Sequence, residues 1–234
     1  MKIFLCGGGS DYKTIEANKK LNEIINHNKP ILYIPLAMDE KVHSYDSCLE
    51  WVKQELSCVE VPNIEMVRTF EELANKKYNN YSAIFIGGGN TFKLLKGIKD
   101  SGSFDKIKNY IEQDGIIFGG SAGAIILGYD IKSCSSMDDN DVELQDTKGF
   151  DVLNGISIFA HYTNHNPKLT EKENLLIDEK YTKSLIDFSI KKGPVIALPE
   201  ENTIYINDND ITVIGNLPYY KFINGKKHKI EIDN

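Results

Sequence analysis

Residues 116–127 read Ile-Ile-Phe-Gly-Gly-Ser-Ala-Gly-Ala-Ile-Ile-Leu, and this stretch decides the fold. It begins with an apolar run typical of a buried strand and ends with an apolar run typical of a buried helix. Between the two runs stands a Gly-x-Ser-x-Gly turn, whose glycines allow a strand and a helix to approach closely. The stretch therefore predicts a sharp strand-to-helix turn that lifts Ser121 off the edge of a sheet.

The rest of the chain alternates short apolar runs with longer amphipathic segments, which indicates an α/β fold with a largely parallel sheet. Further strands are expected at residues 3–6, 31–34, 64–67, 83–86 and 156–159. Helices are expected at residues 14–27, 44–56, 91–98, 104–113 and 172–192, with a polar loop at residues 132–151. The end of the chain predicts β-hairpins from strands at residues 195–198, 203–206, 211–214 and 219–223. One domain over residues 1–234 is the simplest account.

The composition limits the classes of function. With a net charge of −7 and Arg68 as its only arginine, the chain is not expected to bind nucleic acid, because phosphate recognition needs clustered cations. No apolar run reaches the ~18 residues of a membrane span. The apolar run at the start of the chain is too short for the hydrophobic region of a signal peptide. A cytoplasmic protein without membrane contacts is therefore expected. Four scattered cysteines without a CxxC pair favour free thiols over a zinc or redox site.

The Gly-x-Ser-x-Gly turn predicts a nucleophile at Ser121. At such a turn the amide of Ala122 points to where an oxyanion would form, and the helix dipole adds to its field. A glycine-rich turn without chemistry and a phosphate-binding turn are the alternatives. The phosphate interpretation fits poorly, because no glycine cluster of the chain reads GxGxxG and no GK[ST] occurs.

A second oxyanion donor is expected from Gly87-Gly88-Gly89, directly after the strand at residues 83–86. The carboxyl ends of neighbouring parallel strands face one crevice, and a glycine amide approaches a substrate without a side chain in the way. A loose turn without a role is the alternative.

A serine hydroxyl becomes a good nucleophile only when a neighbouring base takes its proton. Among the five histidines, His161 is the best candidate, because it follows the apolar strand at residues 156–159. His27 and His228 have polar surroundings typical of a surface, and the sequence leaves His43 undetermined.

His161 and His165 also form a His-x-x-x-His pair, which raises the alternative of zinc. A zinc helix of the HExxH type would have glutamate at position 162, where this chain has Tyr162. Asn164 and Pro167 speak against a helix as well. No metal site is therefore expected.

The third group of a serine triad is a carboxylate that orients the imidazole. Glu200 follows the apolar strand at residues 195–198, where the carboxyl end of a strand would place it. Asp138, Asp139 and Asp141 in the acidic loop are rivals, and a charged hairpin is the plain alternative for Glu200.

Four segments together resemble the serine peptidase family that includes dipeptidase E (aspartyl dipeptidase) and the cyanophycinases. Residues 87–92 (Gly-Gly-Gly-Asn-Thr-Phe) resemble its glycine loop, and residues 120–124 (Gly-Ser-Ala-Gly-Ala) its nucleophile turn. Residues 161–164 (His-Tyr-Thr-Asn) are similar to its His-Phe-Thr-Asn segment, and residues 198–202 (Leu-Pro-Glu-Glu-Asn) to its Leu-Pro-Glu-Gly-Asn segment. Order and rough spacing agree over about residues 80–206.

The resemblance implies a flavodoxin-like fold related to class I glutamine amidotransferases, with serine in place of their cysteine. It implies Ser121 as nucleophile, His161 as general base and then acid, and Glu200 as the group that orients His161. The implied reaction is hydrolysis of small peptides, as by a dipeptidase or exopeptidase, through an acyl-enzyme and without metal or organic cofactor. The amides of Gly89 and Ala122 would form the oxyanion hole, and candidate substrate contacts are Asp138, Gly88, Asn90 and Thr163.

The chain departs from the family in two places. Glu201 stands where the family motif has glycine, beside the orienting carboxylate. The helix after the His161 segment has no arginine, and Lys168 and Lys172 are the nearest cations. Two alternatives therefore remain for the function. One is another acyl hydrolase, such as a cyanophycin-type or isoaspartyl peptidase, and the other is an amidotransferase-like binding module without catalysis. The sequence does not decide whether the protein is a monomer or a homodimer.

Overall fold

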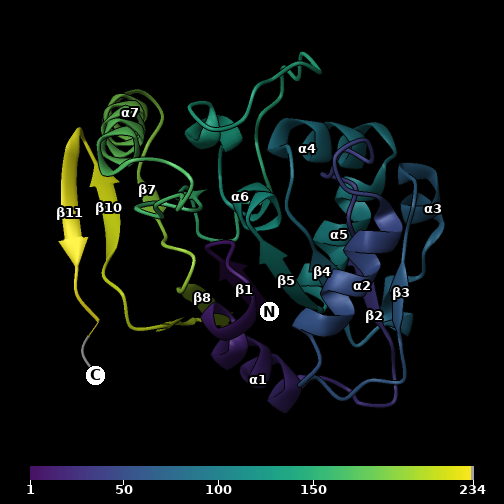
Figure 1. Cartoon of the computed structure of the whole chain (residues 1–234). Helices are drawn as coiled ribbons and strands as arrows, with labels where there is room; N and C mark the ends of the chain where they lie inside the picture. Colours follow the sequence, from purple (N-terminus) through teal and green to yellow (C-terminus); the bar gives the residue numbers. More distant parts are fainter. Residues whose placement is uncertain (233–234) are drawn as a thin grey trace.

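The computed structural model describes residues 1–232 and is built around a seven-stranded sheet (Figure 1). Its strands are β1 (Lys2–Cys6), β2 (Ile31–Ile34), β3 (Ile64–Met66), β4 (Ala83–Ile86), β5 (Ile116–Gly120), β8 (Thr203–Asn207) and β9 (Asp210–Ile214). They are ordered β3-β2-β4-β5-β1-β8-β9; the first five are parallel, and β8 and β9 pair antiparallel. The predicted open, mostly parallel sheet is confirmed.

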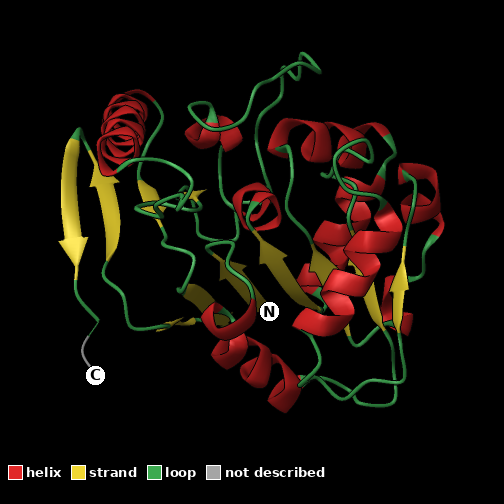
Figure 2. Ribbon diagram, in the orientation of Figure 1, coloured by secondary structure: helices red, strands yellow, loops and turns green. Residues whose placement is uncertain are grey.

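Helices cover both faces of this sheet, because apolar side chains of the parallel strands alternate between two cores. In β1, Ile3 and Leu5 join one core, and Phe4 and Cys6 join the other. The face of Phe4 is covered by α1 (Ile15–Ile24) and α2 (Tyr45–Glu55). The face of Ile3 is covered by α3 (Phe70–Asn75), α4 (Thr91–Asp100), α5 (Ser103–Glu112) and α6 (Ala122–Leu127) (Figure 2).

A second, four-stranded sheet stands beside the first (Figure 1). Its strands are β6 (Ser157–Phe159), β7 (Val195–Ala197), β10 (Tyr219–Ile223) and β11 (Lys226–Ile230), in the order β11-β10-β7-β6. Strands β6 and β7 are parallel, and the long helix α7 (Glu171–Lys191) connects them. This helix packs against β10 and β11. One cluster of buried apolar side chains includes Ile3 of the first sheet and Phe222 of the second. The two sheets therefore share one apolar core.

Short polar side chains precede α2 and α4, as is usual at the start of a helix. Ser44 accepts a hydrogen bond from the amide of Ser47, and Asn90 accepts one from the amide of Lys93. The Asn90 cap fixes the direction in which the chain leaves the glycine turn after β4.

The structure adds elements that the sequence pattern did not indicate. Helix α3 has six residues, and the 3-10 helices η1 (Asp11–Lys13), η2 (Tyr78–Asn80) and η3 (Ile131–Cys134) are shorter, so none shows a recognisable period. The predicted strands at the end of the chain divide between the sheets: β8 and β9 form a hairpin that extends the first sheet, whereas β10 pairs in the second sheet with β7 and with β11, a strand that was not predicted. Among residues 1–232, no helix has the length and apolar character needed to span a membrane.

Candidate active site

The turn between β5 and α6 holds Ser121 in a rare backbone conformation. Its φ of 52° and ψ of −113° lie where residues with side chains are seldom found, so the surrounding packing must impose them. A Cβ on Gly119 would lie 2.6 Å from the Gly123 carbonyl carbon, and a Cβ on Gly123 would lie 2.2 Å from the Ile86 oxygen. Both glycines are therefore required for β5, α6 and β4 to pack together beneath Ser121.

Three loops meet at the carboxyl ends of the neighbouring strands β4, β5 and β1. They are residues 87–89, the Ser121 turn and residues 7–9. Gly88 faces the serine, since a Cβ built on it would lie 3.2 Å from the Ser121 Cβ. The amides of Gly88 and Gly89 have no hydrogen-bond partner among residues 1–232. The glycine loop thus offers unpaired N–H groups beside the serine.

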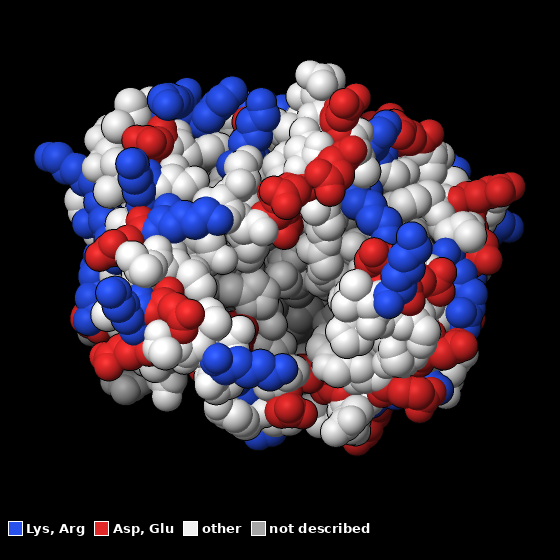
Figure 3. Space-filling model, turned by 45° about the horizontal axis from the view of Figure 1, so that its top comes forward, with Lys and Arg blue, Asp and Glu red and all other residues white. Residues whose placement is uncertain are grey.

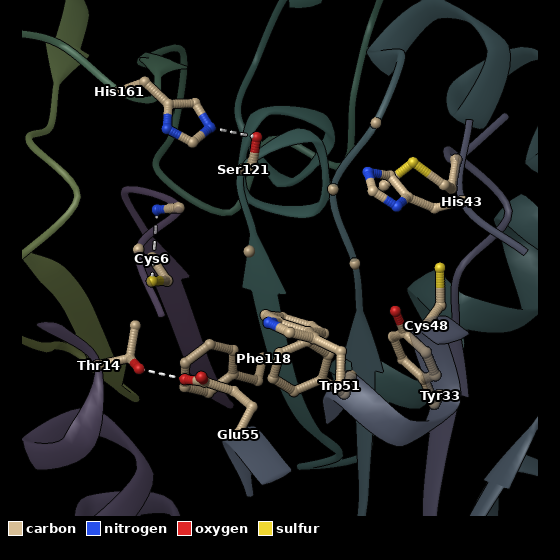
Figure 4. Close-up of a pocket in the computed structure, with 18 of the residues that line it drawn as sticks. Cys6, Thr14, Tyr33, His43, Cys48, Trp51, Glu55, Phe118, Ser121 and His161 are labelled. Carbon is tan, nitrogen blue, oxygen red and sulfur yellow. Dashed lines mark hydrogen bonds between the residues drawn. The ribbon is translucent and has the colours of Figure 1, made fainter. Parts of the chain in front are cut away.

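His161 reaches Ser121 from the second sheet. It lies in the loop after β6, and its Nε2 is 2.8 Å from the Ser121 Oγ (Figure 4). The His161 amide donates to the carbonyl of Gly7 over 2.9 Å, which ties this loop to the loop after β1. Gly8, with φ +108°, leaves room for the imidazole, because a Cβ there would lie 2.4 Å from the His161 Cε1.

Glu200 lies on the other side of the imidazole, in the loop between β7 and β8. Its Oε1 is 2.8 Å from the His161 Nδ1, and its Oε2 accepts a hydrogen bond from the Lys13 ammonium over 2.6 Å. The Glu200 amide donates to the Asn164 side chain over 2.8 Å, which fixes the backbone that carries the carboxylate. The hydrogen bond with His161, aided by Lys13, lowers the pKa of Glu200 to about 2 against the opposing effect of burial. Glu200 is therefore a carboxylate at neutral pH.

Lys13 was not indicated by any pattern in the sequence, yet it joins two carboxylates at the site. Its Nζ is 2.6 Å from Glu200 and 3.3 Å from the Oε1 of Glu201, the residue that departs from the family motif. The other Glu201 oxygen is buried without a partner among the described residues. One ammonium thus balances the charge that Glu201 adds beside the orienting carboxylate.

The remaining predicted residues make hydrogen bonds within the protein. Asp138 accepts from the amide and the hydroxyl of Thr91 over 2.9 and 2.5 Å, at the start of α4. The Asn90 side chain donates to the carbonyl of Asp139 over 2.8 Å. The Thr163 hydroxyl donates to the carbonyl of the preceding residue over 2.6 Å. Asp138 and Asn90 therefore fasten the acidic loop to the glycine loop.

The two histidines of the zinc alternative point to different partners. His161 contacts Ser121 and Glu200, whereas His165 is exposed and lies 3.0 Å from Asp178. In the described part of the chain, no group of three or more His, Cys, Asp or Glu side chains is placed to hold a metal ion.

A cavity of roughly 410 Å³ opens at Ser121 and His161 and extends along the face of the sheet that α1 and α2 cover. The space-filling view in Figure 3 shows a hollow near the middle of the molecule, with uncharged side chains on its floor and charged side chains around it. The sequence left His43 undetermined, and the structure places it at the cavity (Figure 4). Other side chains of the lining are Cys6, Thr14, Tyr33, Met38, Ser47, Cys48, Trp51, Glu55, Phe85 and Phe118.

The strand order, and a serine at the carboxyl end of a central strand, define a class I glutamine amidotransferase-like α/β protein. The sequence model of peptidase family S51 matches residues 3–214, and the chain therefore belongs to this family. Members of the family are serine peptidases, so the predicted family and the predicted class of enzyme are confirmed.

Similar proteins agree with this assignment. A peptidase E from Nostoc sp. is 28% identical over 229 residues, which cover 94% of this chain and 86% of that protein. A peptidase E from Escherichia coli is 30% identical over 150 residues, or 63% of this chain and 62% of that protein.

Two crystal structures share the fold. A candidate peptidase E protein from Listeria monocytogenes EGD-e has a TM-score of 0.68 and 21% identity, covering 92% of this chain and 98% of its own. A peptidase from an acI-B1 Actinobacterium has a TM-score of 0.66 and 17% identity, covering 100% of this chain and 95% of its own. Both confirm the predicted fold class.

Proposed function

We propose that this serine peptidase hydrolyses small peptides, as a dipeptidase or exopeptidase, through an acyl-enzyme on Ser121. The observation that carries the proposal is the continuous series of hydrogen bonds from Ser121 through His161 to Glu200, at 2.8 Å for each contact. This series has the order of nucleophile, base and orienting carboxylate that acyl transfer needs. A location in the cytoplasm stays a prediction from the sequence.

In the first half of the reaction, the Ser121 Oγ attacks the peptide carbonyl while the His161 Nε2 takes its proton. The carbonyl oxygen becomes an oxyanion, which the amides of Ala122 and Gly89 stabilise as hydrogen-bond donors. His161 then gives its proton to the amine, the carbon–nitrogen bond breaks, and the acyl group stays on Ser121. Water, deprotonated by His161, releases the acid and restores the serine.

Glu200 and Lys13 prepare the imidazole for this proton transfer. The Glu200 carboxylate accepts the Nδ1–H of His161, which leaves Nε2 free to act as the base, and it stabilises the imidazolium once this forms. Lys13 holds the other carboxylate oxygen, so that Glu200 keeps one orientation. Lys13 acts through Glu200 and is a positioning residue.

The loops around Ser121 supply the candidate substrate contacts. Gly88 faces the serine, which supports a role of its backbone at the border of a bound peptide. Asp138 and Asn90 hold the start of α4 and would contact the substrate from there, and Thr163 would do so from the loop of His161.

The test is amine release from a panel of dipeptides and end-blocked peptides, by the protein and by its Ser121→Ala variant. We expect cleavage by the protein and a loss of about 10⁶-fold in the variant, as for other serine peptidases. Ser57→Ala, at an exposed serine outside the site, is the matched control and should keep full activity.

Labelling of Ser121 by a serine-directed covalent probe gives a second readout. A protein that cleaves no peptide and does not react with the probe would contradict the proposal and favour the alternative of a binding module. Cleavage of β-linked peptides alone would favour the isoaspartyl or cyanophycin-type alternative.

A further inference from the structure

The cavity next to Ser121 has a chemistry of its own, distinct from that of the hydrogen-bonded site. We propose that it binds a large, uncharged apolar side chain, preferably an aromatic one, of a peptide residue that adjoins the cleaved bond. This inference rests on the proposed function, because Ser121 and His161 line the mouth of the same cavity.

The walls of the cavity are a preformed set of aromatic rings. Phe85 and Phe118 of β4 and β5 stack with ring centres 4.9 Å apart, and Tyr33 of β2 meets Phe85 edge-on at 5.8 Å. Trp51 projects from α2 toward these rings, and its ring centre lies 6.3 Å from that of Phe85 (Figure 4). Rings that already contact each other need little rearrangement to accept one more ring at an edge or a face.

The cavity offers an acidic side chain no permanently charged cation. Its lining, as far as residues 1–232 are described, contains no lysine or arginine, and its acidic residue is Glu55. The single arginine, Arg68, lies at the surface in an ion pair with Asp46. An aspartate or glutamate side chain would therefore lose its hydration, approach the charge of Glu55 and find no lysine or arginine to pair with, which leaves His43 as the imidazole of the lining outside the Ser121–His161 pair.

Glu55 is not placed as a receptor for a basic side chain either. Its carboxylate accepts hydrogen bonds from the hydroxyl of Thr14, from the Asn18 side chain at 3.0 Å and from the Asp11 amide at 3.0 Å. These donors come from η1, α1 and the residue between them, so the carboxylate fastens α2 to this segment. A lysine side chain would have to displace donors that hold the fold together.

The size of the cavity also fits this occupant. A volume of roughly 410 Å³ lies within the range of about 300–1,000 Å³ that is usual for small-ligand sites. The cavity therefore has room for a ring and for part of the adjoining backbone.

The first experiment compares kcat/KM for dipeptides in which Phe, Leu, Lys or Asp is paired with Ala on either side of the bond. We expect Phe to exceed Asp and Lys by at least about 10-fold at one of the two positions, since apolar pockets discriminate on this scale. Trp51→Ala should reduce the ratio of Phe to Ala substrates, and it should fold because Trp51 is 40% exposed. Gln54→Ala, at an exposed position of the same helix, should leave the ratio unchanged.

The second experiment does not depend on catalysis. Trp51 is the only tryptophan of the chain, so its fluorescence reports directly on this cavity. In the Ser121→Ala variant, Phe-Ala and Ala-Phe are titrated against Asp-Ala and Ala-Asp. We expect one Phe dipeptide to change the Trp51 emission at a concentration at least about 10-fold lower than either Asp dipeptide.

The two experiments separate this inference from the proposed function. If the protein cleaves no peptide, the proposed function fails, and the fluorescence titration alone decides the cavity. The inference would be overturned by a preference for Asp or Lys substrates, or by equal use of all side chains. It would also be overturned if Trp51→Ala left the ratio of Phe to Ala substrates unchanged, or if Phe dipeptides did not change the Trp51 emission.

Discussion

The two sheets contribute to the site in different ways. The first sheet provides Ser121 on a turn whose shape is set by backbone packing, because Gly119 and Gly123 leave no space for a side chain. The second sheet provides His161 and Glu200 on loops whose positions depend on hydrogen bonds with distant segments. The comparison teaches that the nucleophile is fixed by close backbone packing within one sheet, whereas its base is fixed by hydrogen bonds between loops of the two sheets.

Among the residues that connect the two sheets at the site, His161 should give the largest effect when it is removed. We expect His161→Ala to lower kcat by about 10⁴-fold or more, because Ser121 then lacks its base. His165→Ala, at the exposed neighbour in the same loop, is the control and should stay within a few-fold of the unmodified protein. Steady-state kinetics on the best dipeptide of the panel measure both. Equal losses in the two variants would contradict the role of His161.

A smaller effect should follow when the imidazole is displaced but kept. In Gly8→Ala the new Cβ would overlap His161, and we expect kcat to fall by about 10²-fold, as for a displacement of about 1 Å. Gly102→Ala is the matched control, since Gly102 has φ +71° and no atom within 4 Å of its Cβ position. If both variants keep full activity, the close fit of Gly8 against His161 is not needed.

A weaker effect again is expected from Lys13, which acts through Glu200. We expect Lys13→Met to lower kcat by roughly 10-fold with little change in KM, because a charge-assisted hydrogen bond to the orienting carboxylate is lost. Lys13→Arg should restore part of the rate. Lys19→Met, at an exposed lysine of α1 paired with Glu16, is the control. A change in KM alone would indicate that Lys13 contacts the substrate instead.

The smallest effect is one on stability and depends on pH. The pKa of Glu200 is lowered from 4.5 to about 2 in the fold, so its contribution to the free energy of unfolding is present above pH 4.5. This contribution is lost as the pH falls from 4.5 toward 2. Urea unfolding of the protein and of Glu200→Gln at a series of pH values should show a difference that shrinks over this range. A difference independent of pH would contradict the ionised state of Glu200.

The sequence was sufficient for the parts of the molecule whose signal is local. The β5 and α6 segments are apolar runs on either side of a glycine turn, so their conformation follows from neighbouring residues. Ser44 and Asn90 cap α2 and α4 by accepting hydrogen bonds from residues three positions on, which is likewise a local contact. The second sheet was not predicted, because three-residue strands such as β6 and β7 do not show which strands they pair with.

Side chains that meet across long stretches of chain were harder to predict. Glu200 and His161 could be paired only through the family resemblance, because four carboxylates stood at plausible places. Lys13 lies 187 positions from Glu200, in a polar segment that resembles any solvated surface. Tyr33, Phe85 and Phe118 belong to apolar runs that indicated buried strands, and only the structure shows that α2 leaves a cavity over them.

The place of β1 in the sheet has a consequence for the order in which the enzyme is completed. A ribosome makes β1 early and β8 late, yet Lys2 pairs with Asn207, and β1 lies between β5 and β8. The nascent chain can therefore build the Ser121 turn long before β1 gains its second neighbour. Glu200 emerges just ahead of β8, so the orienting carboxylate and the last neighbour of β1 arrive together. The hydrogen-bonded series of Ser121, His161 and Glu200 is thus incomplete until the chain has been made as far as the start of β8.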